Sequence, residues 1–439
     1  MHTFEGLRSE FNSFVFENFV TAVEQDTLQA VFHYDIPGLE CFKTRWHFPV
    51  SRTDYNKEIL DRLLFSLGMA EAISYYKCAC PKHFVINCGS LTASQARWWE
   101  KLFFNGLGEF LYVNKINTTM EELVLIEGTA KQEPIHDDTE YSGILVPVGG
   151  GKDSVVSLEV LKGEDITPYL LNGSVASEEC AKLCESSNEP MRVRRILDKK
   201  IIEMNNRGYL NGHIPFSAVL AFSTVIAAYL NGKKYIALSN ESSANESTVK
   251  GSKVNHQYSK SYEFETDFRC YISSLTDSDI YYFSLLRPLS ELQIAHIFSK
   301  QKKYHPVFRS CNAGSKTGVW CCNCPKCLFV YIILSPFLSK EELVGIFGES
   351  LLDKPSMEKY FRELTDIDEN KPFECVGTRS EVLASLRSFM RSGGSSLLTD
   401  RYRAHIEAQG EPIEGILSAW NEENGVPAEL EDRVRAWIS

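Results

Sequence analysis

The sequence has no long uninterrupted apolar run, no excess of basic residues and no basic segment followed by an apolar one at its N-terminus. The longest apolar stretch, residues 214–230, includes Ser217, Ser223 and Thr224, so it is too short and too polar for a membrane span. It predicts a buried helix instead. The opening residues, MHTFEGLRSEF, do not follow the pattern of a secretory signal. We therefore expect a cytoplasmic protein with no membrane partner.

The chain also has an excess of acidic over basic residues, with a formal net charge of −12. A broad surface for nucleic acid needs clustered Lys and Arg, so we expect no nucleic-acid partner. A local basic pocket for a phosphorylated small molecule remains compatible with this charge. Internal repeats and low-complexity segments are absent from the sequence, and 439 residues are enough for two or three globular domains.

The first part of the chain, residues 1–140, predicts an α+β domain. Aromatic-rich segments at 13–20 and 28–34 predict short antiparallel strands, and helical spacing of apolar residues predicts a helix over 59–76. The aromatic stretch 98–114 is typical of core packing or of a domain interface.

From residue 141 to about 335 the pattern changes to alternating strands and helices. Strands are predicted at 144–148, 166–171, 191–197, 235–238 and 281–286, with helices at 153–162, 178–186 and 215–230. This alternation predicts an α/β domain with a parallel, doubly wound sheet, on which ligands bind at the carboxyl ends of the strands. Residues 336–439 predict a helical C-terminal region, interrupted by a Pro- and Gly-marked loop at 371–378.

The strongest motif is a glycine-rich turn between a predicted strand and a predicted helix. It contains Gly149, Gly150, Gly151, Lys152, Asp153 and Ser154. Glycines let the backbone turn sharply, and the following helix start is a natural phosphate seat. The spacing fits neither the Walker A loop nor the dinucleotide fingerprint. The alternative is a glycine-rich turn without a ligand.

This turn resembles the S-G-G-x-D-S signature of PP-loop pyrophosphatases, with Gly149 in place of the usual Ser. The resemblance implies an enzyme that splits ATP into AMP and pyrophosphate to form an adenylate. Lys152 would then neutralise phosphate charge, Asp153 would hold Mg²⁺, and Ser154 would donate a hydrogen bond. By the same resemblance Ser239, Asn240 and Glu241, which follow a predicted strand, would lie near pyrophosphate or its metal; capping of the next element is the alternative.

Cysteines are the second signal. The chain has 13, an odd number, and five of them crowd between positions 311 and 327, which suits a reducing compartment and one metal cluster. The spacing of Cys311, Cys321, Cys324 and Cys327 fits a closed, structural tetrahedral Zn²⁺ site. It resembles the zinc site of 7-cyano-7-deazaguanine synthase, another PP-loop enzyme. Cys322 would be a bystander or an alternate ligand, and reduced thiols packed against the sheet are the alternative to a metal.

Several segments together resemble the UDP-N-acetylmuramoyl-L-alanyl-L-glutamate epimerase family. They are LGMAEAISYYK, FFNGLGEFLYVN, PVGGGKDS, NGHIPFSA, WCCNCPKCLFV and KPFECVGT. The resemblance implies that ATP is consumed to invert the terminal L-Glu of the UDP-MurNAc dipeptide to D-Glu in peptidoglycan synthesis. Adenylylation would remove the carboxylate charge that makes the α-proton hard to abstract.

The sequence does not identify the base that removes this proton. Cys375 is one candidate because it lies in the marked loop and thiolates serve as racemisation bases; a structural thiol is the alternative. His256 and Lys260 are candidates for binding the substrate carboxylate or the UDP phosphates, with a solvated loop as the alternative.

Two other functions stay open at this point, as does the oligomeric state. One is a PP-loop adenylating enzyme acting on a nucleobase or tRNA, similar to 7-cyano-7-deazaguanine synthase, although the acidic charge argues against tRNA. The other is a non-catalytic, zinc-stabilised interaction protein, which the intact Lys152-Asp153-Ser154 sequence disfavours.

Overall fold

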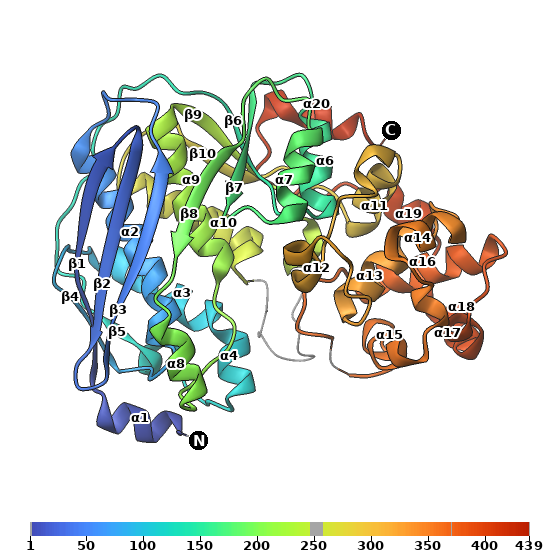
Figure 1. The fold of residues 1–439 in the computed structure, drawn as a ribbon, viewed down its shortest axis with the longest axis horizontal. Helices are drawn as coiled ribbons and strands as arrows, with labels where there is room; N and C mark the ends of the chain where they lie inside the picture. Colours follow the sequence, from blue (N-terminus) through green and yellow to red (C-terminus); the bar gives the residue numbers. More distant parts are fainter. Residues whose placement is uncertain (1, 246–257, 370, 439) are drawn as a thin grey trace. The chain divides into compact units, whose positions relative to one another are not determined.

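The structure is a computed structural model that describes residues 2–245, 258–369 and 371–438. The chain divides into two compact units (Figure 1). Unit 1 comprises Met1–Leu145, Met191–Ile236 and Gln257–Tyr282, and unit 2 comprises Val146–Pro190, Ala237–His256 and Phe283–Ser439.

After the first three strands, helices separate the successive strands except between β5 and β6. In chain order the strands are β1 (Ser13–Glu24), β2 (Thr27–Ile36), β3 (Glu40–Pro49), β4 (His83–Ile86), β5 (Leu125–Ile126), β6 (Ser142–Pro147), β7 (Ile166–Leu171), β8 (Met191–Ile196), β9 (Lys233–Leu238) and β10 (Tyr281–Ser284).

The helices fall into two sets by unit. Those of unit 1 are α1 (Phe4–Glu10), α2 (Lys57–Tyr76), α3 (Ala93–Gly106), α4 (Gly108–Val113), α5 (Met120–Leu123), α8 (Lys200–Asn206), α9 (Phe216–Asn231), the 3₁₀ helix η2 (Tyr258–Lys260) and α10 (Tyr262–Ser273). Those of unit 2 are α6 (Lys152–Val160), α7 (Val175–Leu183), η1 (Ser242–Asn245), α11 (Glu291–Ser299), η3 (Lys302–Tyr304), α12 (Asn312–Thr317), α13 (Pro325–Leu334), α14 (Lys340–Phe347), η4 (Leu351–Asp353), η5 (Pro355–Met357), α15 (Glu358–Leu364), α16 (Arg379–Arg391), α17 (Leu397–Arg401), α18 (Arg403–Gln409), α19 (Ile413–Leu417) and α20 (Ala428–Arg435).

Unit 1 is built on an antiparallel ladder of β1, β2 and β3. The predicted strands at 13–20 and 28–34 are confirmed and are longer than expected. Gln25 and Asp26 join β1 to β2 with positive φ angles of 47° and 57°, as a two-residue type I′ hairpin turn requires. Beyond β1, strands β4 and β5 continue the sheet in parallel.

Strand β8 pairs antiparallel with β3, a partner that the predicted parallel sheet does not include. Its side chains alternate between buried and exposed at Met191, Arg192, Val193 and Arg194. A parallel strand covered on both faces would be apolar throughout, whereas alternation is typical of an antiparallel strand with one polar face. The strand predicted at 191–197 is confirmed, and its antiparallel pairing with β3 was not predicted.

Helices α2 and α9 pack together in the core of unit 1 and confirm the helices predicted over 59–76 and 215–230. The Tyr34 hydroxyl donates a hydrogen bond to the Gly68 carbonyl at 2.7 Å. A Cβ at Gly68 would lie 2.3 Å from Phe16 Cζ, so only glycine lets α2 approach the sheet this closely. Within the ranges that the structure describes, no helix combines the length and apolar composition needed to cross a membrane.

The aromatic stretch 98–114 forms core, as one of the two interpretations predicted. Trp99 is fully buried, and its indole N–H donates to the Tyr271 hydroxyl at 3.1 Å. The Trp99 ring stacks on Phe222 of α9, with ring centroids 5.3 Å apart.

Unit 2 contains β7 and the carboxyl ends of β6, β9 and β10, with strand order β10-β9-β6-β7. Strands β6 and β9 run parallel. The Val148 N–H donates to the Tyr169 carbonyl at 2.9 Å, and the Leu285 N–H to the Leu238 carbonyl at 2.8 Å. Helices α14 to α20 form the helical C-terminal part of the chain, orange to red in Figure 1. The predicted mixed α/β class with a helical C-terminal region is therefore confirmed.

A buried ion pair in unit 1 generates the first prediction. Arg195 donates to both oxygens of the fully buried Glu71 carboxylate, at 2.6 and 2.8 Å, and the Trp46 indole donates to it at 3.0 Å. Glu71→Gln should lower the free energy of unfolding by about 3–5 kcal/mol, because it leaves a buried guanidinium uncompensated. Urea titration followed by tryptophan fluorescence measures this change.

The matched control is Glu58→Gln, which breaks the ion pair between the exposed Glu58 carboxylate and Arg62 on the same helix. Its cost should stay below about 1 kcal/mol, since water and salt screen such a pair. Equal urea midpoints for the two variants would show that the buried pair adds nothing to stability.

Candidate functional site

The glycine-rich turn joins β6 to α6 in unit 2, where the sequence predicts it. Gly150 has φ +83°, and a Cβ there would lie 2.5 Å from the backbone nitrogen of Ser177 at the start of α7. Gly151 is the N-cap of α6, and a Cβ there would lie 3.0 Å from Ser310 Oγ. Gly149 has open space around it, so the hydroxyl-bearing residue usual at this position would fit.

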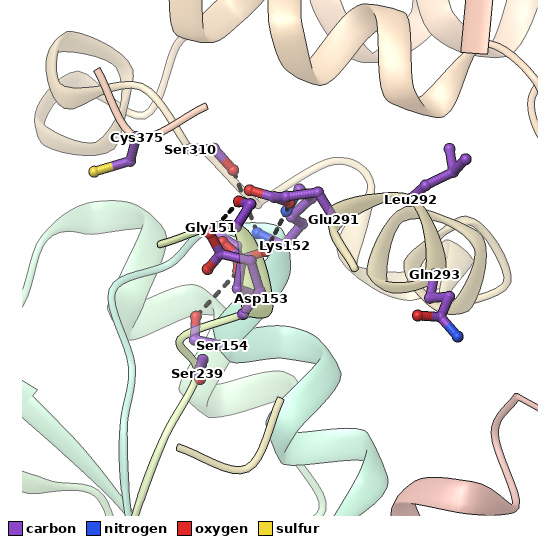
Figure 2. Close-up of polar contacts among 12 residues, drawn as sticks. Gly151, Lys152, Asp153, Ser154, Ser239, Glu291, Leu292, Gln293, Ser310 and Cys375 are labelled. Atoms are coloured by element: carbon purple, nitrogen blue, oxygen red, sulfur yellow. Dashed lines mark hydrogen bonds and ion pairs between the residues drawn. The ribbon is translucent and has the colours of Figure 1, made fainter. Parts of the chain in front are cut away.

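Lys152 points into the protein beneath this turn. It is fully buried, and its ammonium group forms ion pairs with Asp153 and Glu291 (Figure 2). Glu291 is the first residue of α11 and is itself buried. In Figure 2 its side chain turns toward Lys152, whereas Leu292 and Gln293 point away. The turn and the start of α11 are thus held together by one buried charge and two carboxylates.

The electrostatics of this cluster follow from its burial. Burial alone would lower the pKa of Lys152, but the carboxylates of Asp153 and Glu291 outweigh that effect and raise it, so the ammonium stays charged. Burial raises the pKa of Glu291; Lys152 opposes this, and the negative charges of Asp153 and Glu241 add to it. The described part of this site therefore has more acidic side chains than basic side chains to neutralise them.

The segment after β9 lies beside the turn, because β9 and β6 are adjacent strands. The hydroxyls of Ser239 and Ser157 are 2.8 Å apart, which ties the end of β9 to α6. The Asn240 amide donates to the Ser284 hydroxyl at 3.1 Å, and Glu241 is buried. These three sequence-predicted residues therefore gather with the glycine-rich turn, as carboxyl ends of neighbouring parallel strands should.

The loop at 371–378 also reaches this cluster, although it lies far away in the sequence. A Cβ at Gly377 would be 3.0 Å from Glu291 Cγ, so the loop packs directly on Glu291. The ammonium group of Lys326 donates a hydrogen bond to the Cys375 carbonyl. Figure 2 draws Cys375 apart from Lys152, with its sulfur turned away from the ion pairs. Its thiol is half-buried.

Sequence reasoning missed two residues of this site, Glu291 and Lys326. Glu291 lies in a capping box formed by Ser290 and Gln293. Such a box in a sequence predicts the start of a helix, but it gives no sign that the residue within it forms an ion pair. Lys326 stands inside the cysteine motif, where the thiols draw attention first. Only tertiary structure shows that both side chains are buried.

The four predicted metal-ligating cysteines come together. The sulfur atoms of Cys311, Cys321, Cys324 and Cys327 all lie within 4.8 Å of one another, so the four could bind a metal ion. Cys327 Sγ is 3.5 Å from the sulfurs of Cys321 and Cys324. Tetrahedral zinc–thiolate bonds of about 2.3 Å require sulfurs about 3.8 Å apart, close to this spacing.

Backbone donors support the charged form of these thiols. The Gly314 N–H points at Cys311 Sγ at 3.2 Å, and the Cys327 N–H at Cys324 Sγ at 3.4 Å. Cys322, which could have been an alternate ligand, instead donates to the Phe347 carbonyl at 3.2 Å. Cys322 therefore lies outside the group of four sulfur atoms.

Two sequence-predicted candidates remain, His256 and Lys260. His256 lies outside the described residues. Lys260 ends the 3₁₀ helix η2 in unit 1, whereas the glycine-rich turn and the cysteines belong to unit 2.

Comparison with known proteins identifies matches along most of the chain. The family model described as the MurL N-terminal domain matches residues 6–285, and the model described as the MurL C-terminal domain matches residues 307–407. The second range contains the four cysteines and Cys375. No solved structure matches the chain.

Three curated relatives carry the name UDP-N-acetyl-alpha-D-muramoyl-L-alanyl-L-glutamate epimerase. The relative from Xanthomonas oryzae is 35% identical over 408 residues, which are 87% of this chain and 87% of that protein. Those from Salinispora tropica and a Micromonospora species are each 36% identical over 345 residues, or 76% of this chain and 74% and 76% of the respective relatives.

The cysteine cluster generates a prediction with a neighbouring control. Cys321→Ser should remove most of the bound metal and lower thermal stability, because a hydroxyl is a poor substitute for a thiolate ligand. Cys322→Ser should keep the wild-type content, about one zinc ion per chain. Elemental analysis of protein purified without chelators checks both, and equal metal loss in the two variants would contradict the assignment of ligands.

Proposed function

This chain belongs to the MurL family, and on that premise we propose that it inverts the terminal L-Glu of UDP-MurNAc-L-Ala-L-Glu in an ATP-dependent reaction of peptidoglycan synthesis. The family matches confirm the resemblance inferred from the sequence motifs. The observation that carries the proposal is the meeting of the glycine-rich turn with the Cys375 loop at Glu291. The glycine-rich turn is suited to binding a nucleotide, and the loop at 371–378 contributes the thiol of Cys375.

The proposed ATP site is the PP-loop formed by Gly149, Gly150, Gly151, Lys152, Asp153 and Ser154. Gly150 and Gly151 let the turn pack closely against the start of α7 and Ser310, Gly149 has open space beside it, and the start of α6 offers the positive end of a helix dipole. Asp153 is half-buried and would hold Mg²⁺, which shields the phosphate charge when bound. Ser239, Asn240 and Glu241 would line the side of the site next to β9.

Activation of the glutamate carboxylate explains why an epimerase would contain such a site. A carbanion next to a carboxylate is strongly disfavoured, because two negative charges would share neighbouring atoms. Attack of the carboxylate on the α-phosphorus of ATP would release pyrophosphate and leave a neutral acyl group bonded to AMP. The α-proton is then more acidic, and buried positive groups would stabilise the enolate. Return of a proton to the opposite face of the α-carbon would invert the centre, and water would finally hydrolyse the acyl–AMP bond to release AMP and the D-Glu product.

Cys375 is the proposed base for the α-proton. A thiol is a suitable racemisation base because the pKa of a thiol is much closer to neutrality than the pKa of a hydroxyl. His256 and Lys260 remain proposed contacts of the substrate carboxylate or the UDP phosphates. The four cysteines would hold zinc in a structural role, since a closed four-thiolate shell leaves no open position for chemistry.

Removal of the proposed magnesium ligand generates the third prediction. Asp153→Asn should lower the rate of AMP formation by at least about 100-fold, because charge stabilisation at the phosphates is lost. Asp432→Asn, an exposed aspartate of α20, is the control and should keep the wild-type rate. AMP is measured by chromatography with ATP, Mg²⁺ and UDP-MurNAc-L-Ala-L-Glu. Near-normal AMP release by a folded Asp153→Asn variant would refute the ATP site.

The fourth prediction separates activation from inversion. In D₂O the D-Glu product should carry deuterium at its α-carbon only when ATP is present. Cys375→Ser should still release AMP but should invert at least about 100-fold more slowly, because a hydroxyl is scarcely ionised at neutral pH. Chiral analysis of glutamate after acid hydrolysis, with mass spectrometry for deuterium, measures both.

Cys270→Ser, at an exposed cysteine of α10, is the matched control and should invert normally. Inversion by Cys375→Ser at the wild-type rate would remove Cys375 from the mechanism. Deuterium uptake without ATP would refute activation by adenylylation.

A further inference from the structure

Lys326 is a buried lysine that the proposed reaction does not use. It is the second residue of α13 and stands between two proposed metal ligands, Cys324 and Cys327. Only 6% of its surface is exposed, whereas lysine normally reaches solvent. A buried ammonium needs a fixed acceptor, so its position is tied to whatever accepts its hydrogen bonds.

The acceptor is the main chain of the proposed base. The Lys326 ammonium donates to the Cys375 carbonyl and lies 5.2 Å from the centre of the Phe329 ring on its own helix. A second lysine, Lys371, donates to the Gly377 carbonyl at 2.9 Å. Two lysine side chains thus hold the loop at 371–378 by its backbone.

The other end of Lys326 is fixed by the cysteine cluster. Cys324 is the N-cap of α13 and accepts the Cys327 N–H, and the sulfurs of both lie in the four-cysteine group. A metal bound there would pin the first turn of α13 from two sides. Because Lys326 lies within this turn, its backbone is restrained together with the ligands.

We propose that Lys326 is a positioning residue that transmits the geometry of the four-cysteine site to the Cys375 loop. The inference rests on the proposed function, since it takes Cys375 as the base. Fixing the carbonyl of residue 375 fixes the backbone from which the thiol projects. Displacement of a reacting group by about 1 Å costs about 100-fold in rate, so this restraint matters for proton transfer.

A different role predicts a different result. Lys326 could serve merely as a positive charge that balances Glu291 and Glu241 near the ATP turn. In that case loss of its charge would slow adenylate formation and inversion together. A positioning role instead slows inversion and leaves AMP formation largely intact.

The experiment compares Lys326→Gln, Lys326→Arg and, as a control, Lys316→Gln. Lys316 is an exposed lysine of α12 within the same cysteine segment. Each full-length variant is assayed for zinc content, AMP formation, glutamate inversion and the alkylation rate of Cys375 by iodoacetamide, read from the peptide that carries it. Alkylation reports the placement of the thiol even in a protein that does not turn over.

Lys326→Gln should keep its zinc, release AMP within about twofold of wild type and invert about 10- to 100-fold more slowly. Its Cys375 should be alkylated at a clearly altered rate. Lys326→Arg keeps the charge and a donor, so it should recover most of the inversion and the wild-type alkylation rate. Lys316→Gln should match wild type throughout.

Three results would overturn the inference: unchanged inversion and alkylation in Lys326→Gln, an equal loss of AMP formation and inversion, or loss of zinc in that variant. Absence of AMP formation by the wild-type enzyme would refute the proposed function instead. The alkylation rates would still decide whether Lys326 positions the Cys375 loop.

Discussion

The buried ammonium group of Lys152 is the constraint on which the arrangement of unit 2 depends. An unpaired charge at that depth would cost several kcal/mol, so two carboxylates must be brought to it. Asp153 comes from the same turn, but Glu291 comes from α11, 139 residues from Lys152 along the chain. Helix α6 consequently packs against α11. Because Gly377 in turn packs on Glu291, the same ion pair also decides where the Cys375 loop lies.

The charges around Lys152 do not balance, and this imbalance bears on which ligands fit. Glu241, Glu291 and Glu381 are all buried, and burial raises the pKa of both Glu291 and Glu381. The negative charge of Glu241 adds to both shifts. A polyanion such as a triphosphate would raise them further unless it arrived with a cation. The proposed use of a magnesium–ATP complex therefore agrees with the electrostatics of the residues already present.

The sequence predicted those parts of the site that are local in the chain. The glycine-rich turn and the four cysteines each occupy one short segment, and their chemistry requires particular residue types at fixed spacing. Glu291 and Lys326 were not predicted, because the residues near them in the sequence fit simpler interpretations. Glu291 is typical of a helix start, and Lys326 is typical of a surface lysine. The antiparallel pairing of β8 with β3 escaped for a similar reason, since strand partners are set by the whole sheet. The PP-loop fold, the division at residues 140 and 335, and the roles of His256 and Lys260 remain predictions.

The close packing of the Cys375 loop on Glu291 also requires a residue without a side chain. A Cβ at Gly377 would lie 3.0 Å from Glu291 Cγ, from Glu381 Oε2 and from Phe329 Cζ at once. These atoms come from three different helices, so no single small movement would relieve all three contacts. A larger residue would push the Cys375 loop away from Glu291, and with it from the turn that Glu291 holds through Lys152. Activation of a carboxylate and removal of the proton on the adjacent carbon require two groups a fixed short distance apart. In this chain a glycine, rather than any polar contact, leaves the room for that approach.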